Sequence, residues 1–384
     1  MTRPVTFAYP FDNHRSTPLA LAGQFAGALE QSKLIDYLWL WDELSGWFPG
    51  NLWRPENTPA AEVIDSNSLY DPAVEAAFAL AHNPTANIRL TTDAVRTNPA
   101  LLLRQVLTLA NGTEGKIVTA IGAGELRQSK PFGFKRSEGL ARLEDTFVLL
   151  TKLLDETEPF SYQGKHWTFK NATIGNIRPA IRPEFWALGG GPALIDIAAR
   201  YADGFESATP QAIPTVDAYS ETVDAIRGKV AGYGRDPDRF GFGIWLICVM
   251  HDDQQVIEQV LANPLVRYFA GQFGRLDQQM WRQEGIQPVM PDGWHYAIKW
   301  APFEQTAAEI DDIVSRVSPE MARKAFHCGT PAELAALCAR FVDIGVTNIG
   351  ILDMTPLALG PAEGQESVRR SMEIAATVKQ AVAA

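Results

Sequence analysis

Cysteine is scarce in this chain of 384 residues and shows no paired spacing. Cys248, Cys328 and Cys338 are an odd number and form no C-x-x-C motif, so the sequence predicts neither a disulfide framework nor a thiolate zinc site. The six histidines are scattered without H-x-x-x-H spacing, and we expect no metal. A chain of this length builds its core without disulfides, and a reduced, cytoplasmic protein is the simplest interpretation.

Long apolar runs and an excess of positive charge are also missing. No segment approaches the roughly 20 apolar residues of a membrane helix, and the start, MTRPVTFAYPFD, lacks the apolar core of a signal peptide. The net charge of −11 argues against non-specific nucleic-acid binding. Neither G-x-S-x-G nor the Rossmann G-x-G-x-x-G is present. We therefore expect a small-molecule substrate, with no nucleic-acid or membrane partner.

Short apolar runs alternate with helical patterns along the chain. Strands are expected at 5–9, 37–41, 88–92, 117–121, 185–188, 204–207, 240–250 and 347–354, and a small hairpin at 160–169. Helices are expected at 19–32, 71–81, 99–110, 137–155, 192–201, 216–233 and 364–383. This alternation predicts a parallel α/β fold, and its number of units predicts a (β/α)8 TIM barrel. We expect one domain over 1–384, with insertions at about 44–70 and 252–325.

Residues 186–205, WALGGGPALIDIAARYADGF, combine a buried strand, a glycine turn and an amphipathic helix. The strand ends at Leu188, the turn contains Gly189, Gly190 and Gly191, and Pro192 fits the first helical position. Glycines allow close approach of a ligand, and the helix N-terminus offers free N–H groups to a phosphate. We predict that these five residues bind a cofactor; a tight turn without a ligand is the alternative.

This segment resembles the luciferase-like flavin and deazaflavin oxidoreductases. Within them it is most similar to the actinobacterial branch that uses coenzyme F420, which includes the phthiodiolone ketoreductases. The resemblance extends over nearly the whole chain. It implies a (β/α)8 barrel that holds F420 at the carboxyl ends of its strands and transfers a hydride between the deazaflavin C5 and a carbonyl or alcohol. It also implies a homodimer.

Two other functions remain open at this point. One is an FMN-dependent monooxygenase of the same superfamily, and the other is a non-catalytic flavin-binding protein. Absence of the family's histidine after Asp42 keeps the second alternative open, because relatives commonly have Asp-His where this chain has Asp42-Glu43.

The resemblance makes Asp42 and Glu43 candidates for catalysis, with Asp42 also near the cofactor. A glutamate replaces histidine as a proton donor only if burial raises its pKa from about 4.3 toward neutrality. Solvated or helix-capping carboxylates are the alternative. Trp47 stands where relatives place an aromatic residue beside the substrate, although loop packing explains it equally well.

The loops after the third and fourth strands supply further candidates. Thr92, Asp93 and Asn98 match the family segment that contacts the ring. Gly124 and Glu125 are similar to its small-residue turn followed by an acid. The resemblance implies that both contact the cofactor and that Glu125 is the catalytic acid or base. Residues 127–136 hold four cations that suit the anionic tail of F420, although a solvated loop is the alternative: Arg127, Lys130, Lys135 and Arg136.

Aromatic residues complete the predicted substrate site. Tyr9, in the first strand, and Trp245, in the seventh, are predicted to contact the substrate. Trp281, Trp294 and Trp300 precede the last strand and are expected to form either an aromatic lid over the mouth or part of the core.

Overall fold

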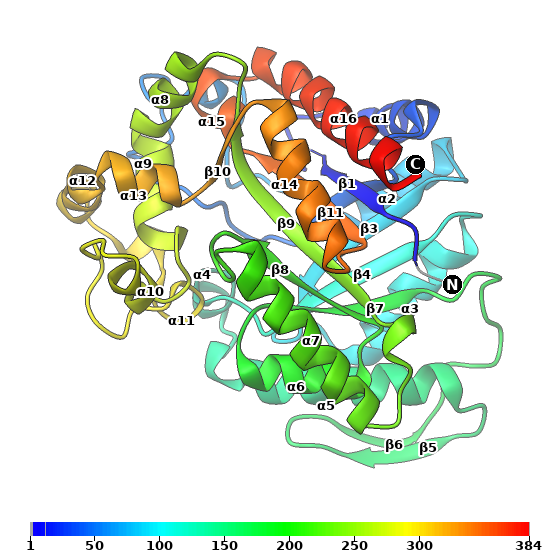
Figure 1. Cartoon of the computed structure of the whole chain (residues 1–384). Coiled ribbons are helices and arrows are strands. Elements are labelled where there is room, and N and C mark those ends of the chain that lie inside the picture. Colours follow the sequence, from blue (N-terminus) through cyan, green and yellow to red (C-terminus); the bar gives the residue numbers. More distant parts are fainter. Residues whose placement is uncertain (1–2, 12, 384) are drawn as a thin grey trace.

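A closed barrel of parallel strands forms the centre of the computed structural model, which describes residues 3–11 and 13–383 (Figure 1). Each strand pairs in parallel with both neighbours, and the pairing of β8 with β9 closes the ring. Among the described residues, the ring consists of eight strands: β1 (Thr6–Pro10), β2 (Tyr37–Trp41), β3 (Asn87–Asp93), β4 (Ile117–Gly122), β7 (Glu184–Leu188), β8 (Gly204–Thr209), β9 (Gly241–Met250) and β11 (Asn348–Asp353). The predicted (β/α)8 barrel is confirmed.

Helices cover the outside of the barrel (Figure 1). They are α1 (Ala20–Ser32), α2 (Pro72–His82), α3 (Pro99–Asn111), α5 (Gly139–Asp155), α6 (Pro192–Tyr201), α7 (Val216–Gly232), α14 (Pro331–Asp343) and α16 (Ala362–Ala383). The sequence prediction omitted α14 and the short strand β10 (His327–Gly329), which pairs with the end of β9. A capping box between Thr330 and Glu333 begins α14 and is readable as T-P-A-E. No helix of the described residues has the length and apolar character needed to span a bilayer.

The predicted hairpin is also present, as the antiparallel pair β5 (Phe160–Gln163) and β6 (Thr168–Ala172). Its turn is held by Asp145 of α5, whose carboxylate accepts hydrogen bonds from the backbone N–H of His166 at 2.7 Å and from the Tyr162 hydroxyl at 2.9 Å. The hairpin is therefore attached to the outer helical layer.

Side chains along each barrel strand alternate between the helices and the barrel interior. In β2, Leu38 and Leu40 belong to the core shared with the helices, whereas Trp39 packs inside the barrel with Trp186 of β7. Both faces of the strands are thus buried, which explains why these segments read as continuous apolar runs.

Glycines make room for the large rings inside the barrel. A Cβ added to Gly204 would lie 2.5 Å from the Trp186 ring, and one added to Gly350 would lie 2.7 Å from the Trp39 ring. Arg89 of β3 and Glu206 of β8 form an ion pair in the same interior, with side chains 1% and 0% exposed. Burial lowers the pKa of Arg89 to about 10, which leaves it charged at neutral pH.

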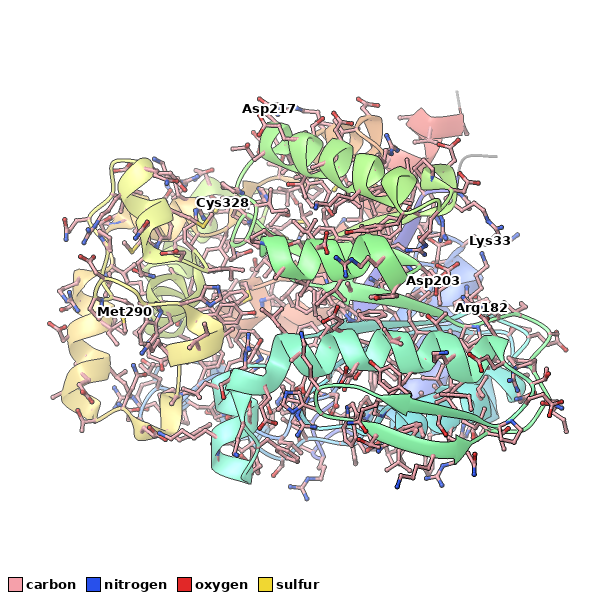
Figure 2. All side chains as sticks on the ribbon, turned by 90° about the horizontal axis from the view of Figure 1, so that it is seen from below. Lys33, Arg182, Asp203, Asp217, Met290 and Cys328 are labelled. Atoms are coloured by element: carbon pink, nitrogen blue, oxygen red, sulfur yellow. The ribbon has the colours of Figure 1, made fainter. Side chains whose placement is uncertain are left out.

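The segments predicted as insertions lie at the carboxyl ends of the strands. Figure 2 shows Met290 and Cys328 on the left, and Lys33, Arg182 and Asp203, which lie at the amino-terminal ends of strands, on the right. The larger insertion contains α8 (Gln254–Ala262), α9 (Pro264–Phe273), α10 (Gln278–Gln283), α11 (Tyr296–Lys299), α12 (Ala307–Arg316) and α13 (Pro319–Lys324). The smaller one contains a short 3-10 helix, η1 (Pro59–Glu62).

The placement of Tyr9 corrects one predicted substrate contact. Its hydroxyl lies 3.0 Å from Ser367 Oγ of α16, and its ring packs against Phe25 of α1, with centroids 6.1 Å apart. Ala8, the preceding residue, takes the inward position. The prediction is wrong because the register of β1 directs Tyr9 to the helical layer, outside the barrel.

We predict that Gly204→Ala destabilises the protein by about 1–3 kcal/mol, because the new methyl group overpacks the buried Trp186 ring. Gly228→Ala is the matched control: it lies in α7 with open space around it, and the change is expected to be neutral or to stabilise by up to about 1 kcal/mol. Denaturant unfolding of both variants measures the difference, and equal stabilities would contradict the packing account.

Candidate active site

Asp42 and Glu43 leave the end of β2 in different directions. The Asp42 carboxylate accepts hydrogen bonds from Thr92 Oγ1 at 2.6 Å and from Arg96 Nη1 at 3.3 Å, which joins the loops after β2 and β3. Burial raises the pKa of Asp42, while Arg96 and Thr92 oppose the rise. Glu43 turns instead toward the loop after β4, as expected for adjacent side chains at a strand end.

Arg127 occupies the centre of the candidate site. Its side chain is 2% exposed, and its guanidinium donates to Glu43 Oε1 at 2.6 Å and to Glu125 Oε2 at 2.8 Å. It also donates to the Ser45 carbonyl oxygen at 2.7 Å and lies 4.1 Å from the centroid of the Trp47 ring. Arg127 thereby holds the loops after β2 and β4 together, with one positive charge between two carboxylates.

Glu125 is the carboxyl of this group best suited to hold a proton. Burial raises its pKa, the positive charge of Arg127 opposes the rise, and the nearby Glu43 adds to it. Burial raises the pKa of the phenol of Tyr296 in α11, and the charge of Glu125 adds to the rise, so the phenol stays protonated at neutral pH. A second carboxyl beside the same cation thus adds to the effect of burial on the pKa of Glu125.

Three predicted cofactor contacts have structural roles of their own. Gly124 has a φ of +81°, and a Cβ there would lie 2.7 Å from Val95 Cγ2, so a glycine is required whether or not a ligand binds. Asp93 accepts from the Arg96 backbone N–H at 3.0 Å and from Arg96 Nε at 2.5 Å. Asn98 caps the start of α3. Their contacts with a cofactor remain predictions.

The turn after β7 leaves the start of α6 open. Gly191 is the N-cap residue and provides no side-chain cap, so the first N–H groups of α6 lack a side-chain partner. Gly189 has a φ of +151°, and a Cβ on Gly190 would lie 3.3 Å from the Ala212 Cβ. Space is open at Gly191. Gly189 is therefore needed by the turn itself, Gly190 has little room for a side chain, and Gly191 leaves room for a phosphate.

These loops lie at one end of the barrel. The strands are parallel, so their carboxyl ends meet at a common edge. Gly122, at the end of β4, pairs with Leu188, at the end of β7, which places the glycine turn beside the loop that carries Glu125. The four predicted loops thus converge on one mouth.

Trp41 and Trp245 form the floor of this mouth. Their rings are parallel within 4° with centroids 6.1 Å apart, and Trp39 lies edge-on to Trp245 at 4.9 Å. The indole nitrogens of Trp41 and Trp245 are buried and have no hydrogen-bond partner among the described residues. Two stacked indole rings with unused N–H donors suit a planar ligand ring that carries acceptor atoms.

Comparison with known proteins agrees with this geometry. A family model described as luciferase-like monooxygenase matches residues 6–348. The chain belongs to the luciferase-like monooxygenase family.

Two bacterial enzymes are among the proteins that are similar to this chain in sequence. The phthiodiolone/phenolphthiodiolone dimycocerosates ketoreductase of Mycobacterium sp. (strain JLS) is 24% identical over 352 residues, covering 90% of this chain and 91% of the relative. The F420-dependent glucose-6-phosphate dehydrogenase of Nakamurella multipartita is 26% identical over 239 residues, or 61% and 65% of the two chains. A solved F420-dependent secondary alcohol dehydrogenase in complex with an F420–acetone adduct aligns with a TM-score of 0.70 at 16% identity, covering 98% of this chain and 99% of that chain.

The cations after β4 do not form the basic surface that the sequence predicts for an anionic tail. They are Arg127, Lys130, Lys135 and Arg136. Arg127 is buried between carboxylates, Lys130 pairs with Glu304 at 2.7 Å, and Lys135 lies 3.8 Å from Glu138. Within the described chain, Arg136 is the member of this group without an ion pair. A continuous basic surface is therefore not formed.

The aromatic residues of the insertion form a core above the mouth. Trp47 packs against Phe269 and Trp300, each with centroids 5.4 Å away. Trp281 and Trp300 are fully buried, which favours the core interpretation for these two, whereas Trp294 is partly exposed. The insertion thus shields the aromatic wall of the mouth from solvent.

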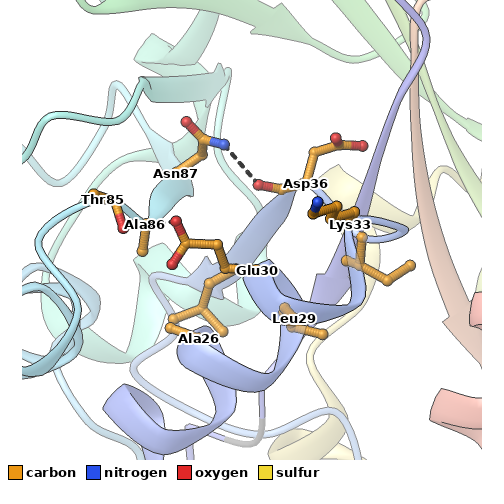
Figure 3. A pocket seen from close by; sticks show the side chains of 10 residues that line it. Ala26, Leu29, Glu30, Lys33, Asp36, Thr85, Ala86 and Asn87 are labelled. Carbon is orange, nitrogen blue, oxygen red and sulfur yellow. Dashed lines mark hydrogen bonds between the residues drawn. The ribbon is translucent and has the colours of Figure 1, made fainter.

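Two cavities lie away from the mouth. One of about 110 Å³ lies at the amino-terminal ends of β2 and β3, where Glu30, Lys33 and Asp36 face it and Asn87 Nδ2 donates to the Asp36 carbonyl oxygen at 2.9 Å (Figure 3). The other, of about 340 Å³, lies within the insertion beside Trp294. Among the described residues no cluster of three His, Cys, Asp or Glu side chains could hold a metal ion.

We predict that Arg127→Met destabilises the protein by about 3–5 kcal/mol, because it leaves Glu43 and Glu125 together without their cation. Lys130→Met is the control: its pair with Glu304 is about half exposed on both sides, and its loss should cost at most about 1 kcal/mol. Chemical unfolding of both variants provides the comparison. A small effect at Arg127 would show that it does not hold the mouth together.

Proposed function

We propose that this protein is an F420-dependent oxidoreductase that transfers a hydride between the deazaflavin C5 and the carbon of a carbonyl or alcohol. The names of both sequence relatives describe redox enzymes, and one of them names F420. The observation that carries the proposal is the position of Glu125, a carboxyl with a raised pKa that Arg127 fixes at the mouth of the barrel.

The residues at the mouth fit such a cofactor. We assign its phosphate to the open start of α6 at Gly191 and its ring to the surface formed by Trp41 and Trp245, whose indole N–H groups are unused. Anions are stabilised at a helix N-terminus by free N–H groups and the helix dipole. When bound, F420 supplies or accepts the hydride.

The chain itself contributes the proton and the position of the substrate oxygen. Glu125 donates to that oxygen during carbonyl reduction and accepts from it during alcohol oxidation. Arg127 Nε donates to Glu125 Oε2 at 2.8 Å and holds the carboxyl in one orientation. Trp47 and the insertion above it keep water from the reacting atoms.

Glu43 has a different role in this proposal. It accepts hydrogen bonds from Arg127 Nη2 at 2.6 Å and from Trp47 Nε1 at 2.7 Å, so both groups fix it in place. It therefore positions Arg127, while Glu125 takes over the acid–base role that histidine has in relatives.

An FMN-dependent monooxygenase is the second candidate, because the matching family model describes monooxygenases. Titration of the full-length protein with F420 and with FMN separates the two, followed by turnover of F420 with alcohols and of reduced F420 with ketones. We expect micromolar binding of F420 and reduction or oxidation of its ring. Micromolar binding of FMN with none of F420 would overturn the proposal, and binding without turnover would favour a non-catalytic flavin-binding protein.

We predict that Glu125→Gln slows turnover by roughly 10²-fold or more, the scale of a lost general acid or base. Wild-type carbonyl reduction should decline as pH rises through the raised pKa of Glu125, because the acid loses its proton, and alcohol oxidation should increase over the same interval. In the variant, neither rate should change with pH over this interval. Glu304→Gln, in the exposed pair with Lys130, is the control and should keep the wild-type profile. An unchanged rate in Glu125→Gln would remove this residue from the mechanism.

A further inference from the structure

The side chain of Gln128 pairs with the loop after β2 as the backbone of a neighbouring strand would. Gln128 lies in the short helix α4 (Leu126–Ser129) and is 3% exposed. Its Oε1 accepts hydrogen bonds from the backbone N–H of Leu44 at 2.7 Å and of Ser45 at 3.3 Å, and its Nε2 donates to the Ser45 carbonyl oxygen at 2.7 Å. One amide thus satisfies three backbone groups of two adjacent residues.

The Ser45 carbonyl oxygen is shared between Gln128 and Arg127. Arg127 Nη1 donates to it at 2.7 Å, the same distance as for Gln128 Nε2. Ser45 Oγ donates in turn to the Arg127 carbonyl oxygen at 3.3 Å. A displacement of the Ser45 backbone would therefore change the contacts of the guanidinium as well as those of the amide.

The same loop begins with Glu43, the residue before Leu44. The Glu43 carboxylate is 12% exposed and pairs with Arg127 Nη2 at 2.6 Å. Glu125 depends much less on this loop, because Arg127 Nε reaches it within the same segment of the chain, at 2.8 Å. Buried backbone N–H groups without a partner are costly, so loss of the Gln128 amide would drive the loop toward water and separate Glu43 from Arg127.

We propose that Gln128 is a positioning residue for the acid–base group of the mouth. Through the backbone of Leu44 and Ser45, it holds Glu43 and the Arg127 guanidinium in one arrangement beside Glu125. The catalytic part of this inference rests on the proposed function, since it needs Glu125 to exchange a proton with the substrate. The arrangement that Gln128 maintains is a property of the protein without any ligand.

Removal of the Gln128 amide should lower the pKa of Glu125. Burial raises that pKa, the charge of Arg127 opposes the rise, and Glu43 adds to it. An open loop reduces the burial, and departure of Glu43 leaves Arg127 to Glu125 alone, so both changes act in the same direction. Three other titratable groups, which are not part of the loop after β2, interact electrostatically with Glu125: Asp93, Arg136 and Tyr296.

An NMR titration of the glutamate carboxyl carbons in the full-length, cofactor-free protein tests the proposal. The Glu125 signal is the one that Glu125→Gln removes. Gln128→Met keeps the length of the side chain and removes all three hydrogen bonds, and we expect the midpoint of the Glu125 titration to fall by about one pH unit. If that variant does not fold, Gln128→Asn keeps an amide on a shorter side chain and should give a smaller shift in the same direction.

Asn67→Ala is the matched control. Asn67 Oδ1 accepts from the Gly46 backbone N–H at 3.0 Å, so this amide also pairs with the loop after β2. Asn67 is exposed and water can take its place, so the midpoint of the Glu125 titration should stay the same. An unchanged midpoint in the folded Gln128 variant, or an equal shift in Asn67→Ala, would overturn the positioning role.

Turnover separates this inference from the proposed function. With F420 and a substrate, Gln128→Met should slow turnover about tenfold and move its pH dependence toward acid by the same interval as the titration. A wild-type protein without F420-dependent turnover would refute the proposed function alone, because the Glu125 titration in the Gln128 variant still decides whether Gln128 positions this group.

Discussion

The guanidinium of Arg127 fixes the geometry of the barrel mouth. It joins Glu43 after β2 to Glu125 after β4, lies on the Trp47 ring, and its carbon is 5.9 Å from the ring centroid of Trp300 in the insertion. A carboxyl that exchanges a proton must be held in one place, and a buried carboxyl must also be compensated for lost hydration. Arg127 meets both needs. Burial still leaves Glu125 with a raised pKa, because Arg127 opposes the rise only in part and the nearby Glu43 adds to it.

The barrel below the mouth supplies a rigid frame for these loops. Trp186 is accommodated by glycines on neighbouring strands, and the ion pair of Arg89 with Glu206 ties β3 to β8 through the interior. At the mouth, the buried indole nitrogens of Trp41 and Trp245 have no hydrogen-bond partner among the described residues. Buried donors of this kind at the carboxyl end of a barrel are available to a ligand.

Much of the frame and part of the site were predictable from sequence. The barrel strands are apolar runs bounded by turn residues, and Asp42, Glu43 and Glu125 follow strand ends directly, so the parallel topology alone brings them together. Pairing over long separations was not predictable. Arg127 lies 84 residues from Glu43. Its place in a basic segment predicts an exposed contact with the anionic tail of a cofactor, whereas it forms a buried ion pair with two carboxylates.

Side-chain direction was the other limit. Tyr9 was assigned to the substrate because it lies in the first strand, but a strand has two faces and only its register decides which one a residue takes. The glycine turn after β7 shows the same limit, since Gly189 is required by the backbone and Gly190 is crowded by Ala212 before any ligand is considered.

The central claim is that this mouth binds a tricyclic redox ring. A crystal structure of the full-length protein grown with F420 tests it most directly. We expect the ring against Trp41 and Trp245, with Glu125 beside it and the phosphate within hydrogen-bond distance of the first N–H groups of α6. F420 bound elsewhere, for example in the cavity of the insertion beside Trp294, would contradict the account.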